Sequence, residues 1–266
     1  EKNKDEAERM AATGFFSSLA FGFLICISGL IFINPLLTVL GSTETIRPYA
    51  EDYIFWLLLG APYMTSALTL NNQLRFQGNA FYAMIALVSG GVLNIALDAL
   101  FVSGLNMGTG GAGLATAIGQ LLSFALLFLG VERKGIVKIR PRNFRFEKLY
   151  LSNIVRGGLP SLGRQSVAGI ASVCTNFVCA AVLNEVEADA AIAALGIVAK
   201  IVGFCSSAII GFGQGFQPVC GFNYGAKKYL RVIRGYVFSL AVCTGFATLV
   251  SIFGGIFATQ ICSPFS

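Results

Sequence analysis

The chain has 266 residues, of which 55 % are hydrophobic and only 12 % are charged. Soluble domains carry about 25 % charged residues, so this composition lacks the charge needed to cover a surface that faces water. The formal net charge of +6 comes from basic residues in short segments between apolar runs, which indicates membrane topology rather than a nucleic-acid surface. We therefore expect an all-α polytopic membrane protein that contacts membrane lipid and binds no nucleic acid.

Seven apolar runs follow one another along the chain, each long enough to cross a hydrocarbon core of about 30 Å. The first run contains Asn34-Pro35, where we expect the helix to bend or end, because a proline lacks an amide hydrogen and its ring clashes with the preceding turn. The expected spans are residues 12–40, 52–72, 80–102, 111–131, 157–183, 189–217 and 235–262.

The basic residues fall almost entirely on one side of these spans. Sixteen of the 19 Lys and Arg residues lie in loops that share one side, whereas Arg47 lies on the other side and Arg164 and Lys200 lie within spans. Loops rich in Lys and Arg stay in the cytoplasm. We therefore expect the first residues and the loop 132–156 to be cytoplasmic, in a multi-pass protein of the bacterial inner (plasma) membrane.

The one long interruption between the spans is VERKGIVKIRPRNFRFEK, residues 131–148. A surface for lipid headgroups is one interpretation of this basic segment, and a linker between two helix bundles is the favoured one. The predicted division assigns residues 1–131 to the last four spans of a first lobe, 132–156 to a cytoplasmic linker and 157–266 to the first three spans of a second lobe.

Two short sequences suggest an internal repeat. GFFSSLA (14–20) and GYVFSLA (235–241) share four residues, and each opens a span after a charged loop on the same side. Transporters are often built from two related halves. Pairing these two spans gives six spans in each half, so we expect the chain to hold spans three to nine of a parent with twelve.

Asp98 is the one acidic residue inside a predicted span, and it stands four residues after Asn94, on the same helical face. A carboxylate within a bilayer costs at least about 2.5–3.5 kcal/mol on insertion scales, so it should face the bundle interior and have a partner. The amide oxygen of Asn94 is a hard ligand that suits Na⁺, and Thr116 on the next span offers a hydroxyl. The pattern predicts a site for Na⁺ or H⁺, with a helix cap as the alternative role for Asp98.

The stretch GFGQGFQPVCGFNYGAKK (211–228) follows the sixth predicted span. Together with the basic linker, the six-span halves and LNIALDALF (93–101), it resembles the MATE (multidrug and toxic compound extrusion) family. We expect its glycines to allow close helix approach and Pro218 to end or bend the helix. The residues that carry this signature are Gly213, Gln214, Gly215, Gln217, Pro218, Gly221, Asn223 and Gly225.

The resemblance implies two lobes around a central cavity and export of organic, often cationic, compounds against Na⁺ or H⁺. It also implies that Asn94, Asp98 and Thr116 form the cation site of the first lobe. We expect a monomeric full-length protein with no cofactor and no metal ion other than possible Na⁺. The side chains predicted to line the cavity are Tyr63, Met64, Asn72, Gln165, Asn176 and Lys200. For Gln165 and Asn176 the alternative is hydrogen bonding between helices.

The leading prediction is a cation-coupled antiporter, and not an enzyme. The alternative within the same superfamily is a flippase for lipid-linked oligosaccharides or lipid precursors, and a structural or receptor-like membrane subunit is less favoured. One intramembrane acid and no histidine argue against an intramembrane enzyme. GTGGAG (108–113) matches a dinucleotide-binding pattern in letters, but it lacks the preceding strand that such a site requires.

Overall fold

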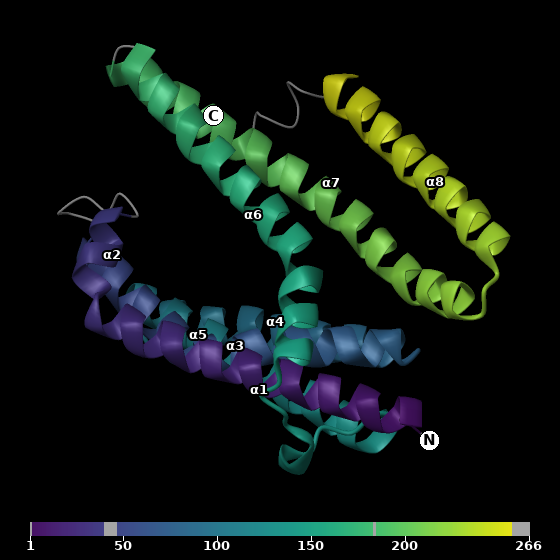
Figure 1. The fold of residues 1–266 in the computed structure, drawn as a ribbon. Coiled ribbons are helices and arrows are strands. Elements are labelled where there is room, and N and C mark those ends of the chain that lie inside the picture. The colour runs from purple at the N-terminus through teal and green to yellow at the C-terminus, as the bar shows by residue number, and fades with distance from the viewer. Residues whose placement is uncertain (1, 40–46, 183–184, 257–266) are drawn as a thin grey trace. The chain divides into compact units, whose positions relative to one another are not determined.

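The computed structural model describes residues 2–39, 47–182 and 185–256, and in these residues the chain forms helices and no strand (Figure 1). The predicted all-α class is confirmed. The elements in chain order are α1 (Lys2–Ile31), α2 (Ile33–Val39), α3 (Arg47–Phe76), α4 (Ala80–Asp98), the π-helix η1 (Ala99–Gly104), α5 (Gly108–Lys134), the 3₁₀ turn η2 (Pro141–Asn143), α6 (Lys148–Val182), α7 (Glu185–Gly225) and α8 (Tyr229–Ile256).

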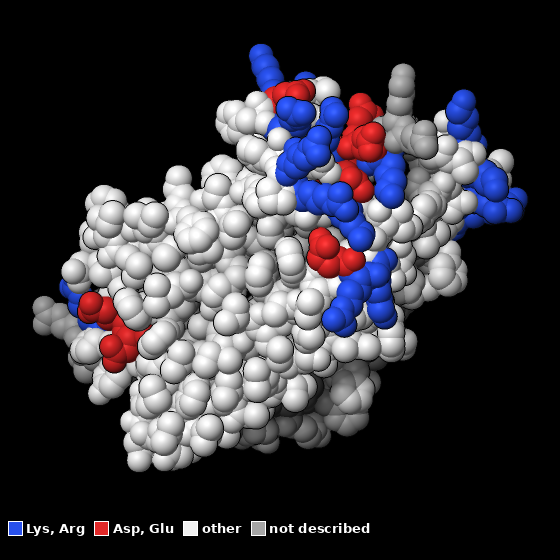
Figure 2. Space-filling model, turned by 90° about the horizontal axis from the view of Figure 1, so that it is seen from below, with Lys and Arg blue, Asp and Glu red and all other residues white. Residues whose placement is uncertain are grey.

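Five stretches of helix in the described residues are long and apolar enough to cross a membrane: Lys4–Ile31, Arg47–Phe76, Ala80–Gly104, Gly108–Lys134 and Tyr229–Ile256. The other two predicted spans lie in α6 and α7, which have 35 and 41 residues, longer than the about 20 that a bilayer requires. Positions 40, 183 and 257–262 of the predicted spans lie outside the described residues. Figure 2 shows the corresponding surface, on which charged side chains gather in groups beside wide areas that carry none.

The first predicted span is interrupted as its proline suggests. α1 ends at Ile31 and α2 begins at Ile33, so the break falls at Phe32. The ring of Pro35 clashes with the carbonyl four residues earlier, which belongs to Ile31. The expected end of the helix near Asn34-Pro35 is therefore confirmed, whereas Pro62 of α3 lies inside a helix that continues for 14 residues beyond it.

The chain divides into two compact units, Glu1–Ile154 and Val155–Ser266. In the first unit α3 packs against α1, α4 and α5, and α5 also packs against α4. In the second unit α7 and α8 pack against each other, after a turn at 226–228 in which Lys227 has a positive φ of 57°. The predicted assignment of lobes and linker stays a prediction; in the structure, residues 135–150 belong to the first unit.

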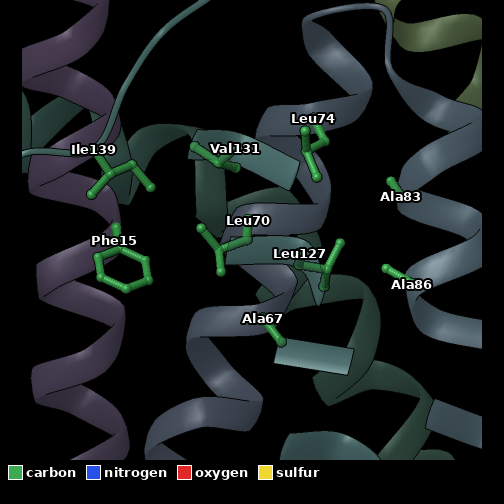
Figure 3. Close-up of a cluster of buried hydrophobic side chains, with 9 residues drawn as sticks. All are labelled: Phe15, Ala67, Leu70, Leu74, Ala83, Ala86, Leu127, Val131 and Ile139. Carbon is green, nitrogen blue, oxygen red and sulfur yellow. The ribbon is translucent and has the colours of Figure 1, made fainter. Parts of the chain in front are cut away.

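The core of the first unit lies near one end of its helices (Figure 3). Leu70, Leu74, Leu127 and Val131 occupy its middle and are fully buried. Phe15 of α1 packs beside them. The remaining members close the two sides: Ala67 of α3, Ala83 and Ala86 of α4, and Ile139 from the segment after α5. The chain beyond α5 therefore contributes to the same core as the spans.

Candidate cation site

The candidate site begins where α4 and α5 cross at closest approach. A Cβ added at Gly119 would lie 2.6 Å from the carbonyl oxygen of Gly90 and 3.0 Å from Cβ of Asn94. A Cβ added at Gly90 would overlap the hydroxyl of Ser123 and the carbonyl of Gly119. Small residues let helix backbones approach closely inside membranes. These two glycines therefore bring the polar residues of α4 within reach of α5.

One turn along from this crossing, a chain of hydrogen bonds joins the two helices. The side-chain amide of Asn94 donates from Nδ2 to Oγ1 of Thr116 over 3.4 Å. The hydroxyl of Thr116 in turn donates to the carbonyl of Ala112 over 2.9 Å. Because the nitrogen of the Asn94 amide is held by Thr116, its oxygen Oδ1 remains available as a ligand. Thr116 therefore joins the side chain of Asn94 to α5, and its predicted part in a cation site stays a prediction.

Asp98 is the last residue of α4 and shares its helical face with Asn94. Its Oδ1 is buried, and among the described residues no group donates a hydrogen bond to it. In a helix cap the carboxylate would accept a hydrogen bond from a backbone N–H, yet Asp98 accepts no such bond at the start of η1. A buried acceptor without a donor costs about 1–3 kcal/mol, and more when it is charged. This oxygen is therefore the part of the site that lacks a partner.

The π-helix η1 follows Asp98 directly. In this wide turn the N–H of Leu105 donates to the carbonyl of Leu100, five residues earlier, over 2.9 Å. A Cβ added at Gly111 of α5 would lie 3.1 Å from Cβ of Phe101, so the glycine leaves room for the wider turn. π-Helical turns occur frequently at functional sites. The sequence analysis missed this element, because its residues, ALFVSG, carry no distinct π-helix signal.

The predicted cavity residues of α3 have the following surroundings. Tyr63 donates from its hydroxyl to the carbonyl of Ala117 over 2.9 Å, so it joins α3 to α5 beside Thr116. Met64 is half-buried. Asn72 is exposed and accepts a hydrogen bond from Arg75 over 2.6 Å. The hydrogen bond of Tyr63 joins two helices, and the predicted cavity roles of all three residues stay predictions.

The predicted cavity residues of the second unit are only partly described. Gln165 is exposed on α6. Asn176 and Lys200 lie in α6 and α7, and their side chains lie outside the described part. Because the two units are described separately, the structure does not bring these residues together with Tyr63 or Asp98. Their assignment to a common cavity stays a prediction.

The glycine-rich signature forms the end of α7 rather than a loop. α7 continues through Pro218 to Gly225, so of the two expected effects of Pro218 the end of the helix is wrong and the bend stays a prediction. A Cβ added at Gly213, Gly215 or Gly221 would meet no atom within 4 Å in this chain. The expected close helix approach at these glycines is therefore absent from the described residues. A proline costs a helix one hydrogen bond, which a helix this long can lose without ending.

A comparison with known protein families decides the identity of this fold. The family model described as MatE matches residues 1–100 and 162–266. The chain belongs to the MATE family. The matched residues include the α4 segment with Asn94 and Asp98 and the whole glycine-rich signature. The resemblance proposed from the sequence is confirmed.

Relatives and solved structures of the MATE family agree with this assignment. The chain is 24 % identical over 265 residues to the multidrug export protein MepA of Staphylococcus haemolyticus, covering 98 % of this chain and 58 % of that protein. It is also 24 % identical over 246 residues to MepA of Staphylococcus aureus strain NCTC 8325, covering 91 % and 53 %. The chain thus spans between half and three fifths of these curated relatives. Their names point to transport rather than catalysis.

Two solved structures share the fold. An outward-facing multidrug resistance MATE transporter of the MOP superfamily aligns with a TM-score of 0.88 and 27 % identity, over 100 % of this chain and 58 % of that one. A MOP superfamily transporter from Pyrococcus furiosus aligns with a TM-score of 0.89 and 27 % identity, over 99 % and 58 %. The MATE-like helical architecture and the multi-pass membrane character predicted from the sequence are confirmed.

Proposed function

We propose that the whole protein exports organic cations in exchange for Na⁺ or H⁺, and that Asn94 and Asp98 bind the coupling ion. The observation that carries this proposal is the buried Oδ1 of Asp98, which lacks a hydrogen-bond donor among the described residues. The names of the relatives support export of drug-like compounds. Transport rather than catalysis is the activity that fits this family.

The chemistry of the site follows from the cost of an unpaired carboxylate in a medium of low polarity. An ionised carboxylate there gains free energy from any cation that reaches it. A proton neutralises the charge of Asp98. A sodium ion keeps the carboxylate ionised and also takes the free Oδ1 of Asn94, because Na⁺ prefers hard oxygen ligands. Both ions satisfy the same unpaired oxygen.

Coupling then requires that the site be accessible from one face of the membrane in one conformation of the protein and from the other face in another. An ion that binds one conformation more tightly shifts the equilibrium toward it by the difference in binding free energy. The change of charge at Asp98 is the local event that supplies this difference. We place the site in the inner membrane, with the first residues and the loop 132–156 in the cytoplasm, because 16 of the 19 basic residues share that side.

The test is ethidium efflux by the whole protein in proteoliposomes, driven by a Na⁺ gradient or by a pH gradient. Asp98→Asn removes the titratable charge and keeps the shape of the side chain, so we expect efflux driven by either gradient to fall to the level of empty liposomes. Asp52→Asn is the matched control, because Asp52 is an exposed acid of α3 in the same unit. Normal efflux from Asp98→Asn would exclude its coupling role.

A second measurement distinguishes a loss of ion binding by Asp98→Asn from a loss of folding. Bound Na⁺ should raise the thermal unfolding midpoint of the detergent-solubilised wild type and of Asp52→Asn, but not of Asp98→Asn. If neither gradient drives ethidium efflux by the wild type, and the same proteoliposomes translocate a lipid-linked oligosaccharide, the flippase alternative replaces the exporter.

A further inference from the structure

The segment from Arg133 to Leu149 is held against the ends of the spans in the first unit. The side-chain oxygen of Gln77, just after α3, accepts hydrogen bonds from the backbone N–H groups of Ile136 and Val137 over 2.6 and 3.0 Å. Asn79, just before α4, donates to the carbonyl of Lys134 over 3.2 Å. The start of this segment is therefore fixed by the turn that joins α3 and α4.

The far end of the segment is fixed by α1. Thr13 and the backbone of Arg145 exchange two hydrogen bonds of 3.2 and 3.3 Å. Asn143 donates to the carboxylate of Glu8 over 3.0 Å. Between these anchors the side chain of Ile139 is buried in the core. The segment is thus a fixed part of the first unit, with one side turned inward.

The anchors also set the depth of the segment in the membrane. α1 has 30 residues and therefore a length of about 45 Å, which exceeds a hydrocarbon core of about 30 Å by several turns. Its first ten residues include six charged residues from Lys2 to Arg9. Thr13 lies near the start of the apolar part, so a bilayer around that part would bring the boundary between hydrocarbon and headgroups to the backbone of Arg145.

The side chains that point away from the core combine two properties. The segment holds seven basic residues and one acidic residue, Glu147. It also exposes large apolar side chains, with Phe146 77 %, Ile136 64 % and Leu149 61 % accessible. Figure 2 shows Lys and Arg side chains gathered together on one face of the molecule, with some acidic side chains among them. Cationic and apolar side chains presented together are the pattern of an interfacial membrane anchor.

We propose that residues 133–149 form a binding surface for anionic phospholipid headgroups, with Phe146 inserted among the acyl chains. The excess of positive charge favours negatively charged lipid, worth about 1 kcal/mol for each Lys or Arg near the surface. Lipid headgroups are the favoured ligand over an acidic protein, because a bilayer already places headgroups at this depth, whereas an acidic protein would have to be recruited to it. The inference needs only that the helices span a bilayer, so it holds or fails independently of the transport activity.

The first experiment uses the purified chain in mixed micelles that contain phosphatidylglycerol or phosphatidylcholine. We expect phosphatidylglycerol to bind more tightly by native mass spectrometry and to raise the unfolding midpoint. The variant R140Q/R142Q/R145Q should bind it about one hundredfold more weakly, about fivefold for each of three charges, with an unchanged midpoint in phosphatidylcholine. The matched control K228Q/R231Q/R234Q removes three charges from the start of α8 and the residue before it, and it should keep the preference.

The second experiment places a tryptophan in the surface. In a Trp56→Phe background, Phe146→Trp should be quenched by phospholipids brominated near the headgroup end of the acyl chains. Lys4→Trp, on the polar start of α1, should not be quenched. An absent preference for phosphatidylglycerol, an equal loss in the K228Q/R231Q/R234Q control, or an unquenched tryptophan at position 146 would each overturn the proposal. If an acidic peptide binds in place of the lipid, the surface belongs to a protein partner instead.

Discussion

α5 and α8 have nearly equal length, and their most apolar parts have equal mean hydropathy, yet their surroundings differ completely. In the most apolar part of α5, 39 % of the residues are buried, and in that of α8 none are. α5 packs against both α3 and α4, whereas α8 packs against α7. Hydropathy therefore indicates that a helix can lie in a membrane, but it does not indicate whether the helix faces lipid or other helices.

Glycine content does not separate the two helices either. A Cβ added at Gly113 of α5 would lie 2.8 Å from the carbonyl oxygen of Tyr53 on α3. A Cβ added at Gly245 or Gly254 of α8 would meet nothing within 4 Å. A glycine becomes important for packing only when its register places it opposite another backbone.

The largest effect is expected for Gly90→Leu, which places a side chain where Ser123 and the carbonyl of Gly119 already lie. Backbone cannot move aside as easily as a side chain, so we expect a loss of about 3 kcal/mol in the free energy of unfolding, the upper end of overpacking costs. Gly245→Leu should be tolerated. Thermal unfolding in detergent measures both, and equal midpoints would show that the crossing is not tightly packed.

A smaller effect is expected for Leu127→Ala in the core of the first unit. Leu127 is fully buried, and truncation leaves a cavity that costs about 2 kcal/mol, at the low end of Leu→Ala values. The value is low because the unfolded reference state in a membrane is also apolar, so only lost packing counts. Leu249→Ala, at a residue of α8 that is 69 % exposed, should change the unfolding midpoint little. A cost for Leu249→Ala as large as that for Leu127→Ala would reverse the comparison.

The smallest effect on stability is expected for substitutions of Thr116. Thr248 of α8 is the matched control residue. Thr116 and Thr248 each donate to the carbonyl four residues earlier, over 2.9 Å. Thr116 also accepts a hydrogen bond from Asn94 of another helix. Thr116→Val should therefore cost about 1 kcal/mol, the net value of a typical hydrogen bond, whereas Thr116→Ser and Thr248→Val should cost less.

The same variants test the positioning role of Thr116. If Thr116 holds the Asn94 amide for the coupling ion, Thr116→Val should weaken Na⁺ binding measured by calorimetry, and Thr116→Ser should restore it. A Thr116→Val variant that loses stability but keeps full ion affinity would reduce Thr116 to a structural contact.

Much of the first unit could be predicted from the sequence, because its signals are local. The apolar runs, the break caused by Pro35 and the shared helical face of Asn94 and Asp98 follow from periodicity and residue chemistry. The π-helix after Asp98 could not be predicted, since it depends on the room that Gly111 leaves beside Phe101. The span predicted in α7 ends at residue 217, whereas the helix continues to Gly225. The sequence offered an end or a bend of the helix at Pro218, and local residue chemistry does not decide between the two.

The anchoring of residues 133–149 lay beyond sequence reasoning for a different reason. Charge and length indicated a linker, with a surface for lipid headgroups as the alternative, but the anchors Gln77 and Thr13 are single polar residues in other parts of the chain, 59 and 132 positions away from their partners. No local pattern links residues at that separation. Only the packed ends of α1, α3 and α5 bring them together.

The anchoring of this segment has a practical consequence for dividing the protein into separately expressed parts. A cut after Lys134, where the spans of the first unit end, would remove Ile139 from the core and leave Gln77 without the two N–H groups that it binds. Tyr150 at the start of α6 is also 7 % exposed. A recombinant first unit should therefore retain the residues through Ile154.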